Sequence, residues 1–215
     1  MNEPKGVWCE LSEHYYTSRP SVEHDRKMIE TELRGRRMKF MTDAGVFGKG
    51  EIDFGSRLLI ETMELPSDAE VLDMGCGYGP VGISAALLAS RGNVWMVDVN
   101  ERAVSLAAEN AKLNGAANTV TRISDLFNGL GTQTFTHILS NPPIRAGKQV
   151  VHQLFEDARS RLRNGGELWI VIQKKQGAPS AFAKLQQLFG DVWEVDKAKG
   201  YRIIKAKKHE NQPNS

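Results

Sequence analysis

The sequence predicts an α/β protein built on a doubly wound, mostly parallel sheet that is completed by an antiparallel hairpin. First, a short apolar run, EVLDM at 70–74, breaks into glycines at every second position and continues as an apolar helical pattern. Second, strand and helix patterns alternate from there to about residue 173, which is typical of a parallel sheet with helices on both faces. Third, the last two strand patterns flank the turn KAKG, which is so short that it allows only antiparallel pairing.

The glycine loop of the first unit predicts a nucleotide-type pocket. Gly75, Gly77 and Gly79 allow positive φ and let a ligand approach the backbone, whose N–H groups can hold a carboxylate or phosphate. Pro80 is suited to the first turn of a helix, where its missing N–H would have no partner. The predicted unit is therefore strand, glycine loop and helix.

The acid before this loop indicates which ligand binds. The spacing G-x-G-x-G departs from the dinucleotide fingerprint, and both Asp73 and Pro80 disfavour a pyrophosphate. An acid suits the ammonium and sulfonium groups of S-adenosylmethionine, whose carboxylate the loop amides can bind. The stretch resembles the first motif of class I S-adenosylmethionine methyltransferases; the alternative is a purely structural turn.

A second strand and helix follow at once. The strand pattern at 93–99 closes with Asp98, and an acid at this position can accept both ribose hydroxyls. Asn100 is expected to cap a helix that ends near Gly115. The predicted buried face of that helix consists of Val104, Ala107, Ala108 and Ala111. The alternative for Asp98 is a solvated strand end.

The third strand, expected at 118–123, leads to Asp125 on the edge where ligands bind in doubly wound sheets. Asp125 is interpreted as an acceptor for the adenine amine, with a helix cap as the alternative. The remaining elements are a fourth strand within 134–140, a helix at 149–162, a strand at 166–173, a helix at 179–190 and two strands within 192–208. A mostly parallel sheet with a terminal hairpin resembles the Rossmann-like class I methyltransferase fold over roughly 51–208.

The residues before this domain predict a small extension. The segment 24–41 alternates polar and apolar residues around a glycine turn, which indicates a β-hairpin, and a helix is expected at 51–64. Phe47, in the loop between them, is interpreted as lying either over the cofactor or in the core. The expected organisation is an extension at 1–50, a methyltransferase domain at 51–208 and a disordered tail at 209–215.

Composition limits the possible partners. The chain has 215 residues, of which 40% are hydrophobic and 25% charged, and a net charge of +2, too small to prove a polyanionic partner. No signal sequence and no run of eighteen apolar residues is visible, and the two cysteines form neither a metal knuckle nor a disulfide framework. We expect a cytoplasmic protein with no membrane and no metal partner.

The chemistry is predicted from the segment after the fourth strand. Asn141, Pro142 and Pro143 place two acceptors, the Asn side-chain oxygen and the Pro142 carbonyl, where one planar amine can bind both. These acceptors draw the amine out of conjugation with its ring and stabilise the positive charge that develops as the amine attacks a methyl group. The motif therefore indicates N-methylation, although a turn-only role is the alternative.

The segment NPPIRAGK, together with the upstream GVF loop, resembles the small-subunit ribosomal RNA guanine-N2 methyltransferase family, the RsmC-like group. The resemblance implies that Asp73 and the three glycines bind the cofactor, that Asp98 binds ribose and Asp125 adenine, and that Asn141 is the catalytic acceptor. One departure is Ile144, because many N-P-P enzymes have there an aromatic residue that stacks on the target base. We also expect no counterpart of the extra N-terminal domain of the longer members.

Several cations are candidates for contacts to RNA phosphates. Arg145 and Lys148 directly follow the acceptors, and Pro143 and Ile144 would contact the base itself. A second cluster, which includes Arg36 and Arg37, crowds the hairpin turn. The alternative for both groups is a solvated face.

The sequence thus predicts an S-adenosylmethionine-dependent N-methyltransferase that modifies the N2 amine of a guanine in small-subunit ribosomal RNA. Its expected partner is ribosomal RNA or the small ribosomal subunit. Three alternatives remain open at this point: a protein-glutamine methyltransferase, a small-molecule amine methyltransferase, and a non-catalytic cofactor-binding regulator. The oligomeric state is not predicted.

Overall fold

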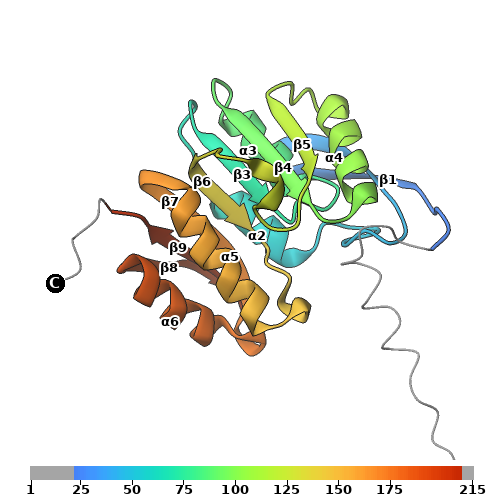
Figure 1. The fold of residues 1–215 in the computed structure, drawn as a ribbon. Helices are drawn as coiled ribbons and strands as arrows, with labels where there is room; N and C mark the ends of the chain where they lie inside the picture. The colour runs from blue at the N-terminus through green and yellow to red at the C-terminus, as the bar shows by residue number, and fades with distance from the viewer. Residues whose placement is uncertain (1–21, 210–215) are drawn as a thin grey trace, which may run out of the picture.

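The computed structural model describes residues 22–209, in which a seven-stranded sheet carries helices on both faces (Figure 1). The strands are β3 (Glu70–Met74), β4 (Asn93–Asp98), β5 (Thr119–Ile123), β6 (Phe135–Ser140), β7 (Leu162–Gln173), β8 (Asp191–Ala198) and β9 (Tyr201–Lys207). Their order across the sheet is β5-β4-β3-β6-β7-β9-β8. The pairs from β5 to β7 are parallel, whereas β9 pairs antiparallel with both β7 and β8. The predicted fold class is confirmed.

Within residues 22–209, five helices cover this sheet. They are α2 (Phe54–Thr62), α3 (Pro80–Leu88), α4 (Glu101–Leu113), α5 (Lys148–Arg161) and α6 (Ala178–Phe189). Short 3-10 turns follow three of the strands: η1 (Asn128–Leu130), η2 (Ile144–Ala146) and η3 (Lys174–Gln176). Helix α2 begins later than expected, because Asp53 is its N-cap and accepts hydrogen bonds from the N–H groups of Gly55 and Ser56 at 2.9 and 3.3 Å.

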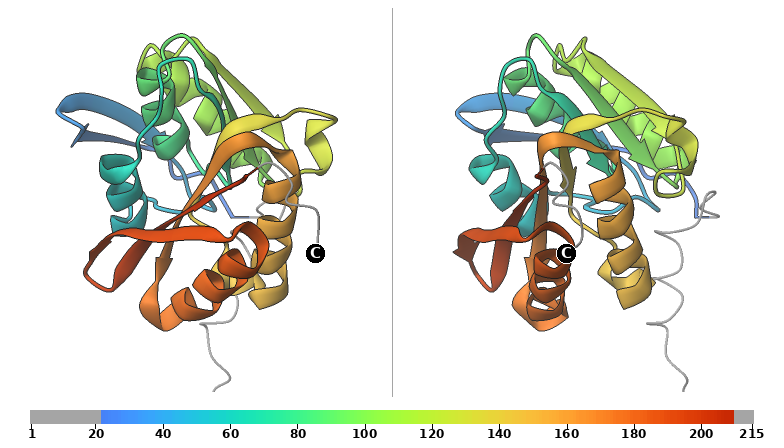
Figure 2. Two further views of the ribbon diagram at one scale, coloured as in Figure 1. Left: turned by 90° about the vertical axis from the view of Figure 1, so that its left-hand side faces the viewer. Right: turned by 60° about the vertical axis from the view of Figure 1, so that its left-hand side comes forward.

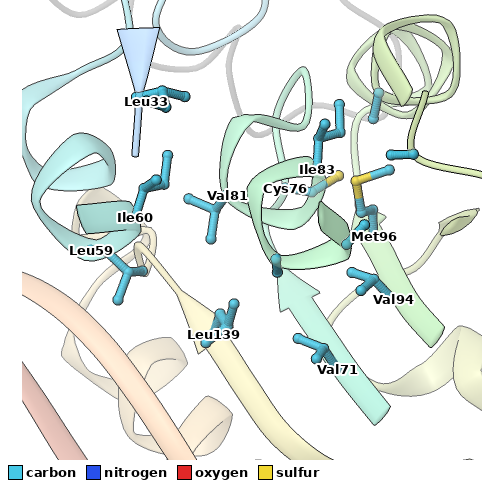
Figure 3. Packing of buried hydrophobic residues seen from close by; sticks show 14 of the residues in the cluster. Leu33, Leu59, Ile60, Val71, Cys76, Val81, Ile83, Val94, Met96 and Leu139 are labelled. Carbon is cyan, nitrogen blue, oxygen red and sulfur yellow. The ribbon is translucent and has the colours of Figure 1, made fainter. Parts of the chain in front are cut away.

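The hydrophobic core forms two layers, one on each face of the sheet. Val71 of β3 belongs to the layer beneath α2, α3 and α4, while its neighbour Leu72 belongs to the layer beneath α5 and α6. This follows from the two-residue period of a strand, which sends successive side chains to opposite faces. Figure 3 shows the first layer, where Val71, Val94 and Leu139 of three strands face Leu59 and Val81 of the covering helices.

The expected N-terminal hairpin is present as β1 (Lys27–Leu33) and β2 (Arg36–Thr42), which pair antiparallel. It lies beside the α2, α3 and α4 side of the molecule and away from α5 and α6 (Figure 2). Its inner residues Leu33 and Phe40 belong to the first core layer, so the hairpin and the main domain share one core. The predicted domain boundary at residue 50 stays a prediction, and the expected tail lies, except for His209, outside the described residues.

Asn110 of α4 and Asn114, the C-cap of the same helix, hold the hairpin through its backbone. Asn110 accepts from the Met41 N–H at 2.7 Å and donates to the Met41 carbonyl at 2.9 Å. Asn114 repeats both contacts with Lys39 at 3.1 and 2.8 Å. The spacing matches, because four helical residues rise about 6 Å and two strand residues about 6.8 Å.

These contacts explain why the predicted buried face of α4 is partly wrong. The buried residues are Ala103, Leu106, Ala107, Asn110 and Ala111. Val104 and Ala108 are only half-buried. The hairpin covers the side of α4 that carries Asn110, and a polar residue in that position leaves no trace in an apolar pattern.

Candidate active site

The predicted functional residues at the ends of three strands meet at one edge of the sheet. Met74 of β3 pairs with Val97 of β4 and with Ser140 of β6. The residues that follow these three, Gly75, Asp98 and Asn141, therefore leave neighbouring parallel strands at the same carboxyl end. This is the edge at which ligands bind in open α/β sheets.

The glycine loop has open space above it. Gly75 and Gly77 have φ values of 76° and 55°, and a Cβ atom at either position would meet no atom within 4 Å. Gly79 also has a positive φ of 98°, but a Cβ there would lie 2.9 Å from the Ile83 side chain and 3.3 Å from Ala107. The first two glycines thus provide the backbone conformation beneath an open surface, while the third also permits close helix packing.

Most amides of this loop already have partners within the protein. The N–H groups of Gly75 and Cys76 both donate to the Val97 carbonyl at 2.9 Å, and that of Gly79 donates to the Cys76 carbonyl at 2.9 Å. The Gly77 N–H donates to Oδ2 of Asp98, also at 2.9 Å. These bonds hold the loop in place. The N–H groups that make them are already used, so they are not available to bind a ligand carboxylate as the sequence predicted.

Asp73 caps the helix that follows the loop. The N-cap residue of α3 is Gly79, which has no side chain, and Oδ2 of Asp73 accepts instead from the N–H of Gly82 at 2.7 Å. Gly82, which was not predicted from the sequence, is required there, because a Cβ would lie 2.4 Å from Met96 and 2.9 Å from Oδ2 of Asp73. Burial, aided by the charge of Asp98, raises the pKa of Asp73 to about 7 despite the Gly82 hydrogen bond.

The second oxygen of Asp73 is available to a ligand. Among the described residues it has no hydrogen-bond partner, and no buried side-chain nitrogen or oxygen there lacks one, so this atom reaches accessible space. A cationic ligand placed against it would stabilise the ionised form of a carboxyl group that is costly to ionise alone. The arrangement fits the ammonium and sulfonium groups of S-adenosylmethionine.

Asp98 is held in position by two backbone donors. Its oxygens accept from the N–H groups of Asn100 and Gly77, each at 2.9 Å. Burial raises its pKa, and these hydrogen bonds act in the opposite direction. Each carboxylate oxygen keeps a further lone pair, which suits a pair of ribose hydroxyls.

Asp125 follows the neighbouring strand and remains exposed. The Ser124 N–H donates to the Asp98 carbonyl at 2.9 Å, so the loop that carries Asp125 starts beside Asp98. The contact of Asp125 with the adenine amine stays a prediction.

The GVF loop lies against both cofactor loops. The Gly45 carbonyl accepts from the Asn100 side chain at 2.8 Å, and a Cβ at Gly48 would lie 3.1 Å from the Tyr78 ring. Val46 is buried, whereas the Phe47 side chain is 53% exposed. The alternative that Phe47 lies in the core is therefore wrong, since Val46 takes that place, and Phe47 remains a candidate for covering the cofactor.

Asn141 has a fixed orientation. Its amide nitrogen donates to Oγ of Ser56 at 3.1 Å and to the Asp53 carboxylate at 3.3 and 3.4 Å. A carboxylate only accepts hydrogen bonds, so the nitrogen of the amide faces Asp53 and the carbonyl oxygen faces away from it. Asn141 thereby presents an acceptor. Asp53 and Ser56 were not predicted from the sequence as site residues, although Asp53 has the signature of a helix N-cap.

The two prolines form a tight turn. The Pro142 carbonyl accepts from the Ile144 N–H at 2.8 Å, and Pro143 has φ −74° and ψ 77°, the geometry of an inverse γ-turn. One lone pair of the proposed second acceptor is thus already used, and the other remains for an amine. Ile144 is half-buried against the core layer beneath α5 and α6, which accounts for an aliphatic residue at this position.

Exposed cations lie around Asn141 at this edge of the sheet, at η2, the start of α5, η3 and the β8–β9 turn. They are Arg145, Lys148, Lys174, Lys175 and Lys199. None of the five has an ion-pair partner among residues 22–209. The Lys174 N–H donates to the Gly200 carbonyl at 2.8 Å, and this hydrogen bond joins η3 to the β8–β9 turn.

The predicted cations of the N-terminal hairpin lie elsewhere. Arg36 is beside Leu87 and Leu88 at the end of α3, about 12 Å along the helix from the glycine loop. Arg34, in the same turn, is structural, because its guanidinium donates to the Ile60 carbonyl at 2.8 Å and to that of Met63 at 3.1 Å. Arg36 and Arg37 are thus exposed near the end of α3 that points away from the glycine loop.

The described residues contain no group of side chains that could hold a metal ion and no helix long and apolar enough to cross a membrane. The sheet order, the acid and glycine loop after β3, the acid after β4 and the oriented Asn after β6 define a class I S-adenosylmethionine-dependent methyltransferase.

Residues 37–205 match the methyltransferase small domain, and the chain belongs to this family. The cofactor is accordingly S-adenosylmethionine. The chain is 54% identical over 200 residues to the uncharacterized protein YbxB of Bacillus subtilis, covering 92% of this chain and all of that protein. It is 26% identical to ribosomal RNA large subunit methyltransferase G of Klebsiella pneumoniae, over 93% of this chain and 54% of the relative.

A solved structure with a similar fold is the T. thermophilus 16S rRNA N2 G1207 methyltransferase (RsmC) in complex with AdoMet and guanosine. The TM-score is 0.75 and the identity 24%, over 88% of this chain and 52% of that chain. The chain thus spans about half the length of each of these two rRNA methyltransferases.

Proposed function

We propose that this protein transfers a methyl group from S-adenosylmethionine to the exocyclic N2 amine of a guanine in small-subunit ribosomal RNA. The observation that carries the proposal is the orientation of Asn141, whose amide nitrogen is bound by Asp53 and Ser56. Its carbonyl oxygen, with the free lone pair of the Pro142 carbonyl, accepts the two hydrogens of the target amine. Positive charge that develops on the amine nitrogen during transfer is stabilised by these acceptors.

The rest of the edge supports this arrangement. Asp73 lies on β3, which adjoins β6, and Asp98 ends β4, one strand further across the sheet. A cofactor bound on both acids therefore presents its methyl group beside Asn141. The amine loses its proton after the methyl group has moved, so no general base is required. A non-catalytic regulator is disfavoured, because the Asp53 contact that orients Asn141 would then have no purpose.

RNA as the substrate is supported by the unpaired cations around Asn141 and by the relatives. Five cations without ion-pair partners in the described residues flank the acceptors, which suits a chain of phosphates. Guanine N2 is the target named for the T. thermophilus enzyme of similar fold. A second candidate is large-subunit rRNA, which is favoured by the similarity to the Klebsiella pneumoniae enzyme. The choice between the two ribosomal subunits and the cytoplasmic location of the protein are both parts of this proposal.

The test is transfer of a tritiated methyl group from S-adenosylmethionine to ribosomal subunits and naked rRNA isolated from cells that lack the gene. We expect label in small-subunit RNA and its recovery as N2-methylguanosine after nuclease digestion. Label in the large subunit would select the second candidate. Label in protein only would favour a protein-glutamine methyltransferase, and cofactor binding without any transfer to RNA or protein would contradict the proposal.

A further inference from the structure

Ile144 is aliphatic, but two aromatic rings lie near the loop that carries Asn141, Pro142 and Pro143. Phe54 follows Asp53, the partner of Asn141, and its ring centroid is 5.6 Å from that of Tyr201 at the start of β9. The Tyr201 ring rests on Gly55, where a Cβ would lie only 2.8 Å from the ring edge. The two rings thus connect the start of α2 with the β8–β9 turn on the substrate side of Asn141.

Tyr201 lies close enough to Asp53 for the charge of that carboxylate to act on its hydroxyl group. Burial and this neighbouring charge both raise the pKa of Tyr201. Tyr201 also pairs with Gln173, the last residue of β7. The aromatic pair is therefore carried by β9 and by α2, whose N-cap Asp53 contacts Asn141.

An exposed cation lies over one face of Phe54. The ammonium of Lys199 lies 4.7 Å from the ring centroid, and Lys199 is exposed in the β8–β9 turn without an ion-pair partner among the described residues. Such a contact is weak at an exposed site. A planar base can replace the ammonium, which is then placed to bind the phosphate of the same nucleotide.

We infer that Phe54 and Tyr201 hold the target base and replace the aromatic residue that is absent at position 144. The ligand is an unpaired nucleotide in single-stranded RNA, because a base within a duplex cannot reach a ring beside the catalytic loop. Lys199 binds its phosphate. The inference deepens the proposed function and rests on it for the position of the reacting amine, while the binding step does not require transfer.

The competing explanation is that the two rings only pack the β8–β9 hairpin against α2. Phe54→Leu distinguishes base binding from packing, because leucine retains an apolar side chain but cannot stack on a base. Phe54→Tyr retains the ring. The matched control is Trp193→Leu, which removes an exposed aromatic from the edge strand β8, away from the acceptors.

The probe is a ten-nucleotide single-stranded RNA that carries one 2-aminopurine, whose fluorescence is quenched by stacking, titrated in the presence of S-adenosylhomocysteine. We expect quenching by the wild type and by Trp193→Leu. The affinity for the RNA is expected to fall about ten- to a hundredfold in Phe54→Leu, which corresponds to the loss of one base–aromatic stacking contact. In Phe54→Tyr it is expected to stay within a few fold of the wild type. Lys199→Ala is expected to reduce the salt slope of binding by about 0.7.

Cofactor affinity and melting temperature are measured on the same variants, and they are expected to match the wild type. Wild-type affinity and quenching in Phe54→Leu, or absence of quenching by the wild type, would overturn the inference. A wild type that binds the oligonucleotide through Phe54 but methylates no rRNA would support this binding site and contradict the proposed function, so the two failures are distinguishable.

Discussion

The amide nitrogen of Asn141 lies 3.3 Å from a carboxylate oxygen of Asp53, which stands 88 residues earlier in the chain at the start of α2. The same carboxylate caps that helix through the N–H groups of Gly55 and Ser56. One side chain therefore fixes both the helix start and the direction of the proposed catalytic acceptor.

We expect Asp53→Asn to separate these two roles. Asparagine is as good an N-cap as aspartate, so the free energy of unfolding should change little. An amide both donates and accepts, so it no longer forces the nitrogen of Asn141 toward α2. The rate constant of transfer should fall about ten- to a hundredfold, the value of one hydrogen bond to a charged group, while the KM for cofactor stays constant. An unchanged rate constant in Asp53→Asn would show that Asn141 needs no such orientation.

A second prediction concerns Asn110, which joins the hairpin to the glycine loop. It is buried and donates to the Tyr78 carbonyl at 2.8 Å in addition to its two contacts with Met41. Asn110→Ala leaves three backbone groups without partners and should destabilise the protein by about 2–4 kcal/mol, measured by urea unfolding. Asn114→Ala, the more exposed counterpart, should cost about 1 kcal/mol. Equal destabilisation in the two variants would contradict this interpretation.

Cofactor affinity should depend on pH through Asp73. Because its pKa is raised to about 7, the carboxyl group is neutral below that pH and ionised above it, and only the ionised form attracts a cation. We expect the affinity for S-adenosylmethionine, measured by calorimetry between about pH 6 and 8, to rise with pH. In Asp73→Asn, which keeps an acceptor for Gly82, the profile should be flat and the affinity low.

The same shift affects folding. The pKa in the folded state lies above the ordinary value of 3.8, so this group destabilises the cofactor-free protein increasingly as pH rises from about 4 to 7. Asp73→Asn should therefore gain stability relative to the wild type at about pH 8 compared with about pH 4.

The salt dependence of RNA binding should distinguish the two groups of cations. For a short single-stranded RNA, the slope of log affinity against log salt should fall by about 0.7 for each phosphate that is no longer neutralised, hence by about 1.4 in Lys174→Ala/Lys175→Ala. The matched pair Arg36→Ala/Arg37→Ala, at the far end of α3, should alter the slope only for an RNA long enough to reach the hairpin. A reduced slope with the short RNA in this second pair would place the substrate on the hairpin.

Local signals in the sequence were sufficient for the architecture and for the cofactor edge. The glycines after β3, the Asn100 cap and the KAKG turn each act within a few residues, so their conformations follow from the residues themselves. Residues at the ends of neighbouring parallel strands necessarily meet, which is why Gly75, Asp98 and Asn141 could be placed together.

The parts that could not be predicted depend on contacts between distant segments. The Asp53–Asn141 contact and the Phe54–Tyr201 pair exist only after α2 has packed against the ends of β6 and β9. The buried Asn110 interrupts an apolar face because it satisfies the backbone of a hairpin far away in sequence. Arg36 and Arg37 belonged to a cation cluster in the sequence, but the hairpin carries them away from Asn141.

The central claim, that Asn141 stabilises charge formed only during methyl transfer, is tested most directly by single-turnover transfer to RNA at saturating cofactor in Asn141→Ala. Interactions present only in the transition state affect the rate and not the ground-state affinity. We predict a rate lower by about a hundred- to a thousandfold, with cofactor affinity within a few fold of the wild type and an intermediate rate for Asn141→Asp. A weakened cofactor affinity with an unchanged single-turnover rate would contradict the claim, since Asn141 would then be only a wall of the cofactor pocket.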